Sequence, residues 1–247
     1  MMARIWTVAR TMWSHGSGRY SLIVLGIWLV TAVVSLFWTP QPLLATDGYH
    51  AWDTPSPAHP LGTDGTGADV LSWLMAGSAT NLAIAMLSVL CSAAIGLLLV
   101  GCMVSRRSGV ASATVAVVDA LISIPTVLIA LLLTVPLGAS AGVIVGACSI
   151  AYGLNLARIA RPAAMLAATS EYAQSARLGG ASGWYVLTRH VVPNIVPVLM
   201  VQLSMSAGTS ILAEAGLTYL GVGVGAGTPS WGHSLATSVK FINVFPL

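Results

Sequence analysis

One acidic side chain lies deep inside an apolar run of this sequence. Asp119 stands within the stretch from Val110 to Leu137, which carries no other charged residue. Acids in such runs usually face a cavity, a partner or a water path, or they mark an intramembrane catalytic site. An aspartyl protease needs a second, facing acid, and Glu214 lies only at the end of a different apolar run. A pathway carboxylate and a carboxylate near the membrane interface therefore both stay open for Asp119.

Other chemistry-bearing residues form no recognisable constellation. The only lysine, Lys240, is not preceded by the glycines of a phosphate-binding loop, so no ATP site is expected in this chain. No two histidines stand four residues apart on one helix, and the cysteines lie within apolar runs as small hydrophobes. We predict no catalytic residue, no metal site and no cofactor. The scattered histidines are His15, His50, His59, His190 and His233.

A long polar connection, residues 158–190, is the most informative segment. Ser170 can cap a helix that begins at Glu171, whose charge suits a helix N-terminus, and Gly179-Gly180 can end it. Ser182 can then cap another turn. The segment predicts a helix-turn-helix with a small-residue side that a partner's groove could approach. An amphipathic segment resting on lipid headgroups is the alternative.

The amino-acid composition indicates whether the segments that carry these residues lie in water or in a lipid bilayer. Of the 247 residues, 56% are hydrophobic and only 7% are charged, and the mean hydropathy is +0.87. A soluble domain carries about a quarter charged residues. The composition excludes a water-soluble fold and favours the bilayer, and the ten basic residues form no cluster that suits nucleic acid.

Five apolar runs are long enough to be membrane helices. The first follows an arginine-bearing segment and resembles a signal peptide, but its length and its Trp-Thr-Pro ending favour an anchor. Small residues in the fourth run suggest close helix packing. We therefore predict an all-α polytopic transmembrane bundle with spans at residues 21–38, 79–104, 110–137, 138–157 and 191–213.

Charge asymmetry predicts the orientation. The arginines cluster before the first run, between the second and third, and between the fourth and fifth, while four aspartates share the segment 39–78. The positive-inside rule places the N-terminal segment 1–20 and the 158–190 loop in the cytoplasm, and 39–78 outside. The arginines concerned are Arg4, Arg10, Arg19, Arg106, Arg107, Arg158, Arg161, Arg177 and Arg189.

Three further features have plain interpretations. The alternating glycines of 221–227 predict a flexible surface loop, since their spacing is not that of a dinucleotide-binding motif. Pro193 is tolerable in the first turn of a helix. Met200 and Met205 suit lipid or core packing better than a pathway.

The polar connection of residues 158–190 resembles the cytoplasmic signature of the permease subunits of ATP-binding-cassette importers, in the dipeptide, oligopeptide and nickel branch. The matching stretches are Glu171-Tyr-Ala-Gln-Ser-Ala-Arg-Leu-Gly-Gly-Ala-Ser182 and Arg189-His-Val-Val-Pro-Asn194. Gln174 and Ser175 depart from the Glu and Ala usual there, and the change removes a carboxylate. The resemblance implies that this loop docks on an ATPase through Glu171, Gln174, Ser175, Ala176, Arg177, Gly180, Pro193 and Asn194.

Two other stretches resemble the external motifs of the same branch. One runs from His59 to Ser72 and includes Gly62, Asp64 and Asp69, although Ala68 and Trp73 replace the branch's usual arginines. The other contains Glu214 and the Thr-Pro-Ser-Trp-Gly stretch around Trp231.

The resemblance implies a type I importer permease core over residues 79–247, with a sixth helix expected beyond Leu247. It implies a homologous permease partner, two ATPases that carry ATP and Mg²⁺, an extracytoplasmic binding protein, and the cell inner membrane as location. Peptides are the leading cargo and nickel or another chelated metal the alternative; an intramembrane enzyme or a membrane scaffold belongs to other classes. Candidate pathway residues are Asp119, Ser123, Met205 and Thr209.

Overall fold

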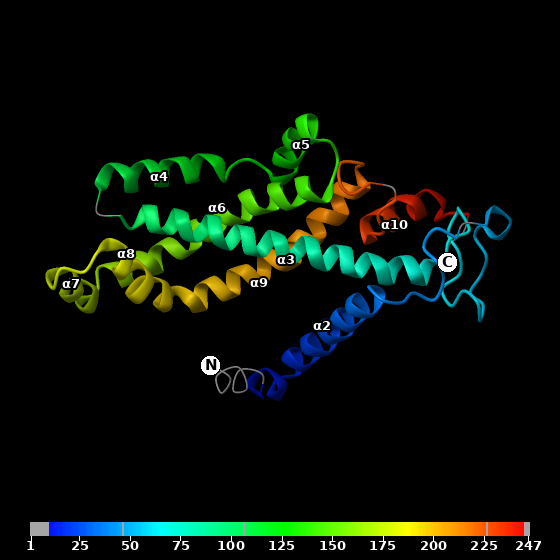
Figure 1. The fold of residues 1–247 in the computed structure, drawn as a ribbon, viewed down its shortest axis with the longest axis horizontal. Coiled ribbons are helices and arrows are strands. Elements are labelled where there is room, and N and C mark those ends of the chain that lie inside the picture. Colours follow the sequence, from blue (N-terminus) through cyan, green and yellow to red (C-terminus); the bar gives the residue numbers. More distant parts are fainter. Residues whose placement is uncertain (1–9, 46, 106, 226, 245–247) are drawn as a thin grey trace. The chain divides into compact units, whose positions relative to one another are not determined.

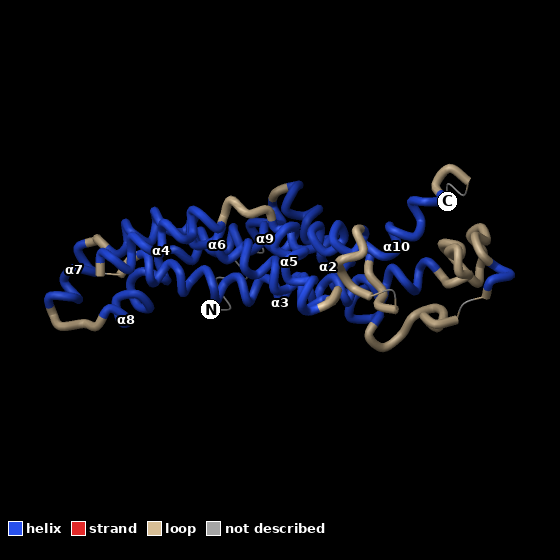
Figure 2. The backbone as a smooth tube through the Cα atoms, turned by 90° about the horizontal axis from the view of Figure 1, so that it is seen from above, coloured by secondary structure: helices blue, strands red, loops and turns tan. Residues whose placement is uncertain are grey.

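A computed structural model describes residues 10–45, 47–105, 107–225 and 227–244. Arg4, Arg106 and the final residues 245–247, which entered the sequence predictions, lie outside this part. The described backbone consists of helices and loops, with a single isolated bridge between Thr63 and Asp69 (Figure 2). The prediction of an all-α membrane protein is confirmed. The chain divides into two compact units, residues 1–82 with 226–247 and residues 83–225, which we describe separately.

The first unit joins the beginning of the long helix α3 (Val70–Met103) to a much later segment of the chain. It contains α2 (Gly16–Ser35), a 3₁₀ turn (Gly48–His50), α10 (Trp231–Ser238) and a second 3₁₀ turn (Val239–Phe241). The indole of Trp231 donates a hydrogen bond to the Leu74 carbonyl at 3.1 Å, and the Trp73 and His233 rings stack 5.7 Å apart. These contacts hold α10, which the sequence analysis did not predict, against the first turns of α3.

The second unit contains the remainder of α3 and the helices from α4 to α9 (Figure 1). These are α4 (Ser108–Leu121), α5 (Thr126–Leu137), α6 (Ala141–Ala168), α7 (Glu171–Leu178), α8 (Gly183–Val186), a π-helical turn (Leu187–Val191) and α9 (Val192–Tyr219). Helix α6 packs against α4, α5 and α9 and supplies more buried residues than any other helix of the unit. It is therefore the centre of this unit.

Helices α3 and α6 approach closely because each presents a glycine to the other. A Cβ at Gly96 would lie 2.6 Å from the Leu156 side chain, and one at Gly153 would lie 2.8 Å from that of Ile95. Membrane helices associate through such small residues because lipid supplies no hydrophobic force between them. The predicted small-residue packing of this bundle is present at these two positions.

Four helices are long and apolar enough to cross a membrane, and a fifth span results if α4 and α5 count together. They are Gly16–Ser35, Val70–Met103, Ala141–Ala168 and the continuous helical stretch Gly183–Tyr219. The predicted span over 110–137 is not one straight helix, because α4 and α5 meet at 89°. Pro125 stands at this break, and a proline disfavours helical backbone in the residue before it.

Helix ends differ from the predicted span ends. Helix α3 begins at Val70, within the stretch expected to be a loop through residue 78, and α6 continues to Ala168, beyond the expected end at residue 157. The prediction treated polar and charged residues as ends of spans. A charge ends an apolar run but does not end a helix, because an arginine side chain can extend toward a polar region. Consequently Arg158 and Arg161 lie within α6 and not in a loop.

The glycine-rich segment after α9 is not simply a flexible surface loop, as the sequence had suggested. Val224 is buried against Leu217, and its amide donates a hydrogen bond of 3.2 Å to the Thr218 hydroxyl. The Thr218 hydroxyl in turn donates to the Glu214 carboxylate at 2.9 Å. These bonds fold the segment back onto the last turns of α9. Ala226 lies outside the described residues.

Candidate docking hairpin and polar sites

The segment from Thr169 to Val191, called the docking hairpin below, forms the predicted helix-turn-helix. Helix α7 begins at Glu171 directly after Ser170, as expected, and Glu171 occupies its first turn. The predicted side-chain cap was wrong in detail. The Ser170 hydroxyl donates to the Ala167 carbonyl at 2.7 Å and so closes the end of α6 instead of accepting from an α7 amide.

The turn between α7 and α8 is closed by backbone hydrogen bonds. The Ala181 amide donates to the Ala176 carbonyl and the Gly180 amide to the Arg177 carbonyl, both at 3.0 Å. Gly180 has φ +85°, a left-handed conformation that costs glycine little and other residues more. The Ser182 hydroxyl accepts from the Tyr185 amide at 3.2 Å, which confirms the second predicted cap. The turn therefore has one defined geometry.

Helix α7 is anchored in the core of the second unit. Ala173 is fully buried in the same cluster as alanines of α6 and valines of α8 and the π turn. The Gln174 side-chain amide donates to the Thr169 carbonyl at 2.7 Å. An ionised glutamate could not donate this bond, so glutamine at this position satisfies a carbonyl at the end of α6.

Aromatic side chains join the two ends of the docking hairpin. The ring of His190 lies 5.7 Å from that of Tyr172 in α7 and 5.8 Å from that of Tyr185 in α8. The Asn194 amide donates to the His190 carbonyl at 2.6 Å, and Pro193 lies in the first turn of α9, as predicted. Sequence reasoning missed His190 because its neighbours come from three separate turns.

Both helices of the docking hairpin carry exposed apolar side chains. Leu178 is 90% exposed and Trp184 is 74% exposed. Glu171 and Ser175 are also exposed, while Ala176 and Arg177 are partly buried. Sequence reasoning did not select Leu178, although an isolated leucine in an otherwise small and polar helix was an available signal. Exposed apolar residues on a rigid segment are typical of a protein interface.

The candidate pathway residues fall into two separate pairs. On α4, the Asp119 carboxylate lies 3.1 Å from the Arg158 guanidinium of α6, and the Ser123 hydroxyl lies 3.4 Å from the Asp119 carbonyl. Asp119 therefore faces a base and not the second acid that a protease needs. Both charged side chains are about half exposed, and charges in membrane helices face water or a protein partner more often than lipid.

The other pair, Met205 and Thr209, lies one turn apart on α9. Met205 is 61% exposed, and the Thr209 carbonyl accepts a hydrogen bond of 3.2 Å from the Tyr152 hydroxyl of α6. The Thr209 hydroxyl donates to the Met205 carbonyl. This pair therefore belongs to the α6–α9 contact, with the methionine side chain outward.

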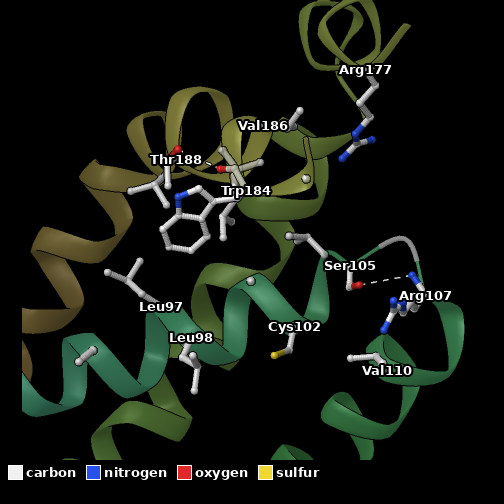
Figure 3. Close-up of a pocket in the computed structure, with 17 residues that line it drawn as sticks. Leu97, Leu98, Cys102, Ser105, Arg107, Val110, Arg177, Trp184, Val186 and Thr188 are labelled. Carbon is white, nitrogen blue, oxygen red and sulfur yellow. Dashed lines mark hydrogen bonds between the residues drawn. The ribbon is translucent and has the colours of Figure 1, made fainter. Parts of the chain in front are cut away.

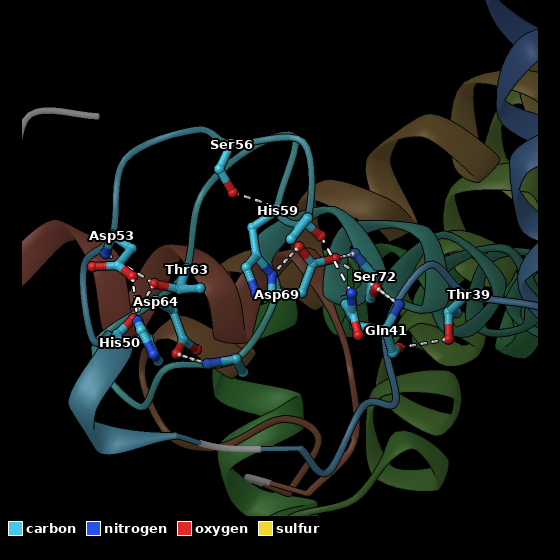
Figure 4. A network of polar contacts seen from close by, with 12 residues as sticks. Thr39, Gln41, His50, Asp53, Ser56, His59, Thr63, Asp64, Asp69 and Ser72 are labelled. Atoms are coloured by element: carbon cyan, nitrogen blue, oxygen red, sulfur yellow. Dashed lines mark hydrogen bonds and ion pairs between the residues drawn. The ribbon is translucent and has the colours of Figure 1, made fainter.

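The polar loop, residues 39–69, is organised around two aspartates (Figure 4). The buried carboxylate of Asp69 lies 3.0 Å from His59 Nδ1 and accepts from both the amide and the hydroxyl of Ser72. The Asp64 carboxylate accepts from Thr66 and from the Ala68 amide. Asp69 thus ties the loop to the first turn of α3.

Two of the remaining motif residues are buried. Glu214 is fully buried on α9. Gly62 lies in the polar loop next to Thr63 of the Thr63–Asp69 bridge, and a Cβ at Gly62 would meet the Asp53 carbonyl.

His50, in the polar loop, is exposed. The hydrogen bond from His50 to Asp53, 2.7 Å long, raises the pKa of the imidazole above its usual 6.5, and the charges of Asp53 and Asp47 act in the same direction.

The chain is similar to known membrane transport proteins over most of its length. The sequence profile of one family, described as "Binding-protein-dependent transport system inner membrane component", matches residues 92–245. A "Probable peptide ABC transporter permease protein" of Sinorhizobium fredii is 32% identical over 93% of this chain and 80% of its own length. The glutathione transport system permease of Pectobacterium atrosepticum is 30% identical, over 92% of this chain and 77% of its own. The nickel transport system permease of Escherichia coli K12 is 29% identical, over 95% and 84%. These names agree on the class of protein and differ in the cargo.

Proposed function

The chain belongs to the family of binding-protein-dependent transport system inner membrane components, and we propose that it forms half of the translocation pathway of an ATP-driven peptide importer. It is a multi-pass membrane protein, and its relatives are permease subunits of transport systems, which are not enzymes. The family description and the apolar helices support this class. The cargo, the partners and the orientation are further parts of the proposal.

Peptides are the proposed cargo because the 32% identical relative from Sinorhizobium carries a peptide permease name. Nickel, free or chelated, is the second candidate, favoured by the match to the nickel permease over 95% of this chain. Both cargoes use the same architecture. We propose that an extracytoplasmic binding protein selects between them before the cargo reaches the membrane helices.

The proposed orientation places the docking hairpin in the cytoplasm. Arg10 and Arg19 flank the start of α2, Arg107 follows α3, and Arg177 and Arg189 lie in the docking hairpin. The aspartates of the polar loop lie in the chain between the end of α2 and the start of α3. This asymmetry supports a cytoplasmic N-terminus by the positive-inside rule.

The proposed partners are a homologous permease, two ATPases and the binding protein. Each ATPase would hold ATP and Mg²⁺ and carry out hydrolysis, and this chain would receive the movement. The docking hairpin suits that role because its exposed Leu178 and Glu171 are available to a groove on another protein.

The attachment of the docking hairpin to two long helices is the observation that carries the proposal. The Gly180 turn, the Gln174 bond and the rings around His190 fix α7 and α8 to the ends of α6 and α9. Those two helices also pack against each other along their length. A displacement of α7 by an ATPase would therefore move both helices together, which is what alternation between inward-facing and outward-facing states requires.

Copurification tests the docking part of the proposal. The chain is expressed with its permease and ATPase partners and purified through a tag on this chain. Leu178→Asp places a charge where an apolar side chain is expected to be buried, so the ATPase should be lost. Leu220→Asp is the matched control, because Leu220 is 61% exposed at the opposite end of α9. Retention of the ATPase by Leu178→Asp, or equal loss with Leu220→Asp, would contradict docking through this face.

Uptake by proteoliposomes tests the cargo. The assembled importer is supplied with its binding protein and ATP, and uptake of a labelled oligopeptide is compared with uptake of radioactive nickel, free or chelated. Peptide uptake that unlabelled nickel does not inhibit would support the peptide assignment. Uptake of nickel alone would replace it with the nickel alternative while leaving the docking result unaffected.

A further inference from the structure

An apolar groove in the second unit has two arginines in its lining. The groove has a volume of about 930 Å³ and lies between α3, the residues after it, and the α8 to π-turn segment of the docking hairpin (Figure 3). Leu97, Leu98 and Cys102 of α3 line it together with Trp184 of α8, whose ring lies toward Leu97. Small-molecule sites usually measure about 300 to 1,000 Å³, so the groove is large enough for part of an extended ligand.

The two arginines are Arg107, which follows α3, and Arg177 of α7. Neither is paired with a carboxylate among the described residues. The Nε atom of Arg177 is buried and has no hydrogen-bond acceptor in the described part of the chain. An unpaired buried guanidinium nitrogen is costly unless an anion satisfies it. The positive charge in this lining therefore calls for an anionic ligand.

The apolar wall formed by α3 extends into the membrane-spanning part of that helix. Groove residues of α3 extend from Ala94 to Cys102 in the last turn of the helix, a rise of about 12 Å at 1.5 Å per residue. Trp184 is 74% exposed beside this wall, and tryptophan is enriched where membrane meets water. The ligand must therefore combine a negative head with an apolar portion along the helix.

We propose that this groove binds an anionic phospholipid, with its phosphate at Arg107 and Arg177 and an acyl chain along Leu97, Leu98 and Cys102. A soluble protein could reach the arginines but not the wall within the bilayer. An apolar helix of another subunit could cover the wall but would leave both guanidinium groups without an anion. Only an anionic lipid satisfies both parts, and basic pockets between membrane helices are a known form of lipid site.

Native mass spectrometry of the complex, extracted in a mild detergent with its bound subunits, tests the proposal. The complex is stripped of lipid and titrated with phosphatidylglycerol or with phosphatidylcholine. We expect preferential binding of phosphatidylglycerol. Arg107→Gln and Arg177→Gln should each weaken it about fivefold, and the double variant about 25-fold, with phosphatidylcholine binding unchanged. The matched control is Arg189→Gln, which removes an exposed arginine of the π turn outside the groove and should have no effect.

Two further variants separate charge from folding. The Arg107→Lys, Arg177→Lys double variant keeps both charges and should retain phosphatidylglycerol within a few-fold of the wild type. Cys102→Phe keeps both arginines but fills the apolar wall, so it should weaken binding of the lipid. Glycerol phosphate, which has the head but no acyl chain, should not displace it.

Several results would overturn the proposal. They are equal affinity of the wild type for the two lipids, unchanged phosphatidylglycerol binding in the Gln double variant, and full displacement by glycerol phosphate. Protection of the groove by another subunit in a complex that binds no phosphatidylglycerol would replace the lipid with a helix. The ATPase-docking test is read out separately, because its variants, Leu178→Asp and Leu220→Asp, change residues outside the groove.

Discussion

Replacing Gly180 with valine tests whether the docking hairpin works as a rigid lever. Gly180 has φ +85°, and a Cβ built there meets no heavy atom within 4 Å. The substitution therefore introduces no clash, and its effect comes from backbone conformation alone. For a β-branched residue a positive φ is a genuine outlier.

The expected size of the effect of Gly180→Val follows from the left-handed backbone conformation at this position. Holding an L-residue in the left-handed region costs roughly 1 to 2 kcal/mol, which is about a fivefold to thirtyfold shift in any equilibrium that competes with the native turn. The turn joins α7 to α8 through the Ala181 to Ala176 hydrogen bond, so opening it would release α7 from α8. The core of the second unit contains no part of Gly180, so the melting temperature of the bundle should change little.

The assay measures ATPase activity stimulated by cargo and binding protein in proteoliposomes, together with thermal unfolding. Gly180→Val should lower the stimulated activity about fivefold or more while leaving basal ATPase activity and ATPase copurification in place. Gly183→Ala is the matched control. Gly183 is an exposed glycine of the same hairpin, lies in the first turn of α8, has no positive φ and also has open space around its Cβ.

Two results would refute the lever. Wild-type stimulation by the Gly180→Val importer would show that the left-handed turn is not needed for coupling. An equal loss in Gly183→Ala would show that any added side chain on this surface interferes, which points to steric exclusion of the ATPase and not to backbone geometry.

Three other perturbations act on single contacts. Asp119→Asn should lower the melting temperature by only about 2 °C, because the ion pair to Arg158 is half exposed and such pairs contribute at most about 1 kcal/mol; exchanging the two residues should restore it. Thr218→Val removes an acceptor and a donor from buried partners and should cost about 2 kcal/mol, or roughly 5 °C. The His50 pKa, measured by NMR, should lie above 6.5 and fall in Asp53→Asn. Since that pKa is raised in the folded state, its stabilising effect is present below pH 6.5 and is lost as pH rises through the folded value.

Each of these perturbations has a control. Arg161→Gln removes an exposed arginine one turn after Arg158 and should leave the melting temperature unchanged. Thr209→Val removes only a hydroxyl bond to its own helix on exposed α9 surface, so it should cost much less than Thr218→Val. His50→Gln should abolish the pH dependence of amide protection in the polar loop, and a dependence that persisted there would contradict the assignment to His50.

The sequence alone determined the solvent and the class of this protein. A chain with 7% charged residues cannot cover its surface with ions, so its helices had to face lipid. Local signals also gave the correct position of α7 in the sequence, because Ser170, Gly179 and Gly180 influence the backbone of only a few neighbouring residues. The same short range explains why the Ser182 cap and the position of Pro193 were correct.

Longer-range features were not available from the pattern. The break between α4 and α5 was missed because an apolar run has the same composition whether its helix is straight or bent at Pro125. Arg158 was assigned to a loop because the sequence shows where apolar residues stop and not where a helix ends. Its pairing with Asp119 depends on α6 crossing α4 at that level.

The tertiary structure decided which residues act together. Asp119 is a lone acid in the sequence and half of an ion pair in the fold, Leu178 became notable only through its exposure, and His190 acquired two tyrosine neighbours from separate turns. Arg107 and Arg177 are 70 positions apart and line one groove only because α7 folds back beside the end of α3. Composition and local propensity act along the chain, whereas contact, burial and unpaired charge depend on which helices pack together, and that is set by the sum of many weak interactions across the bundle.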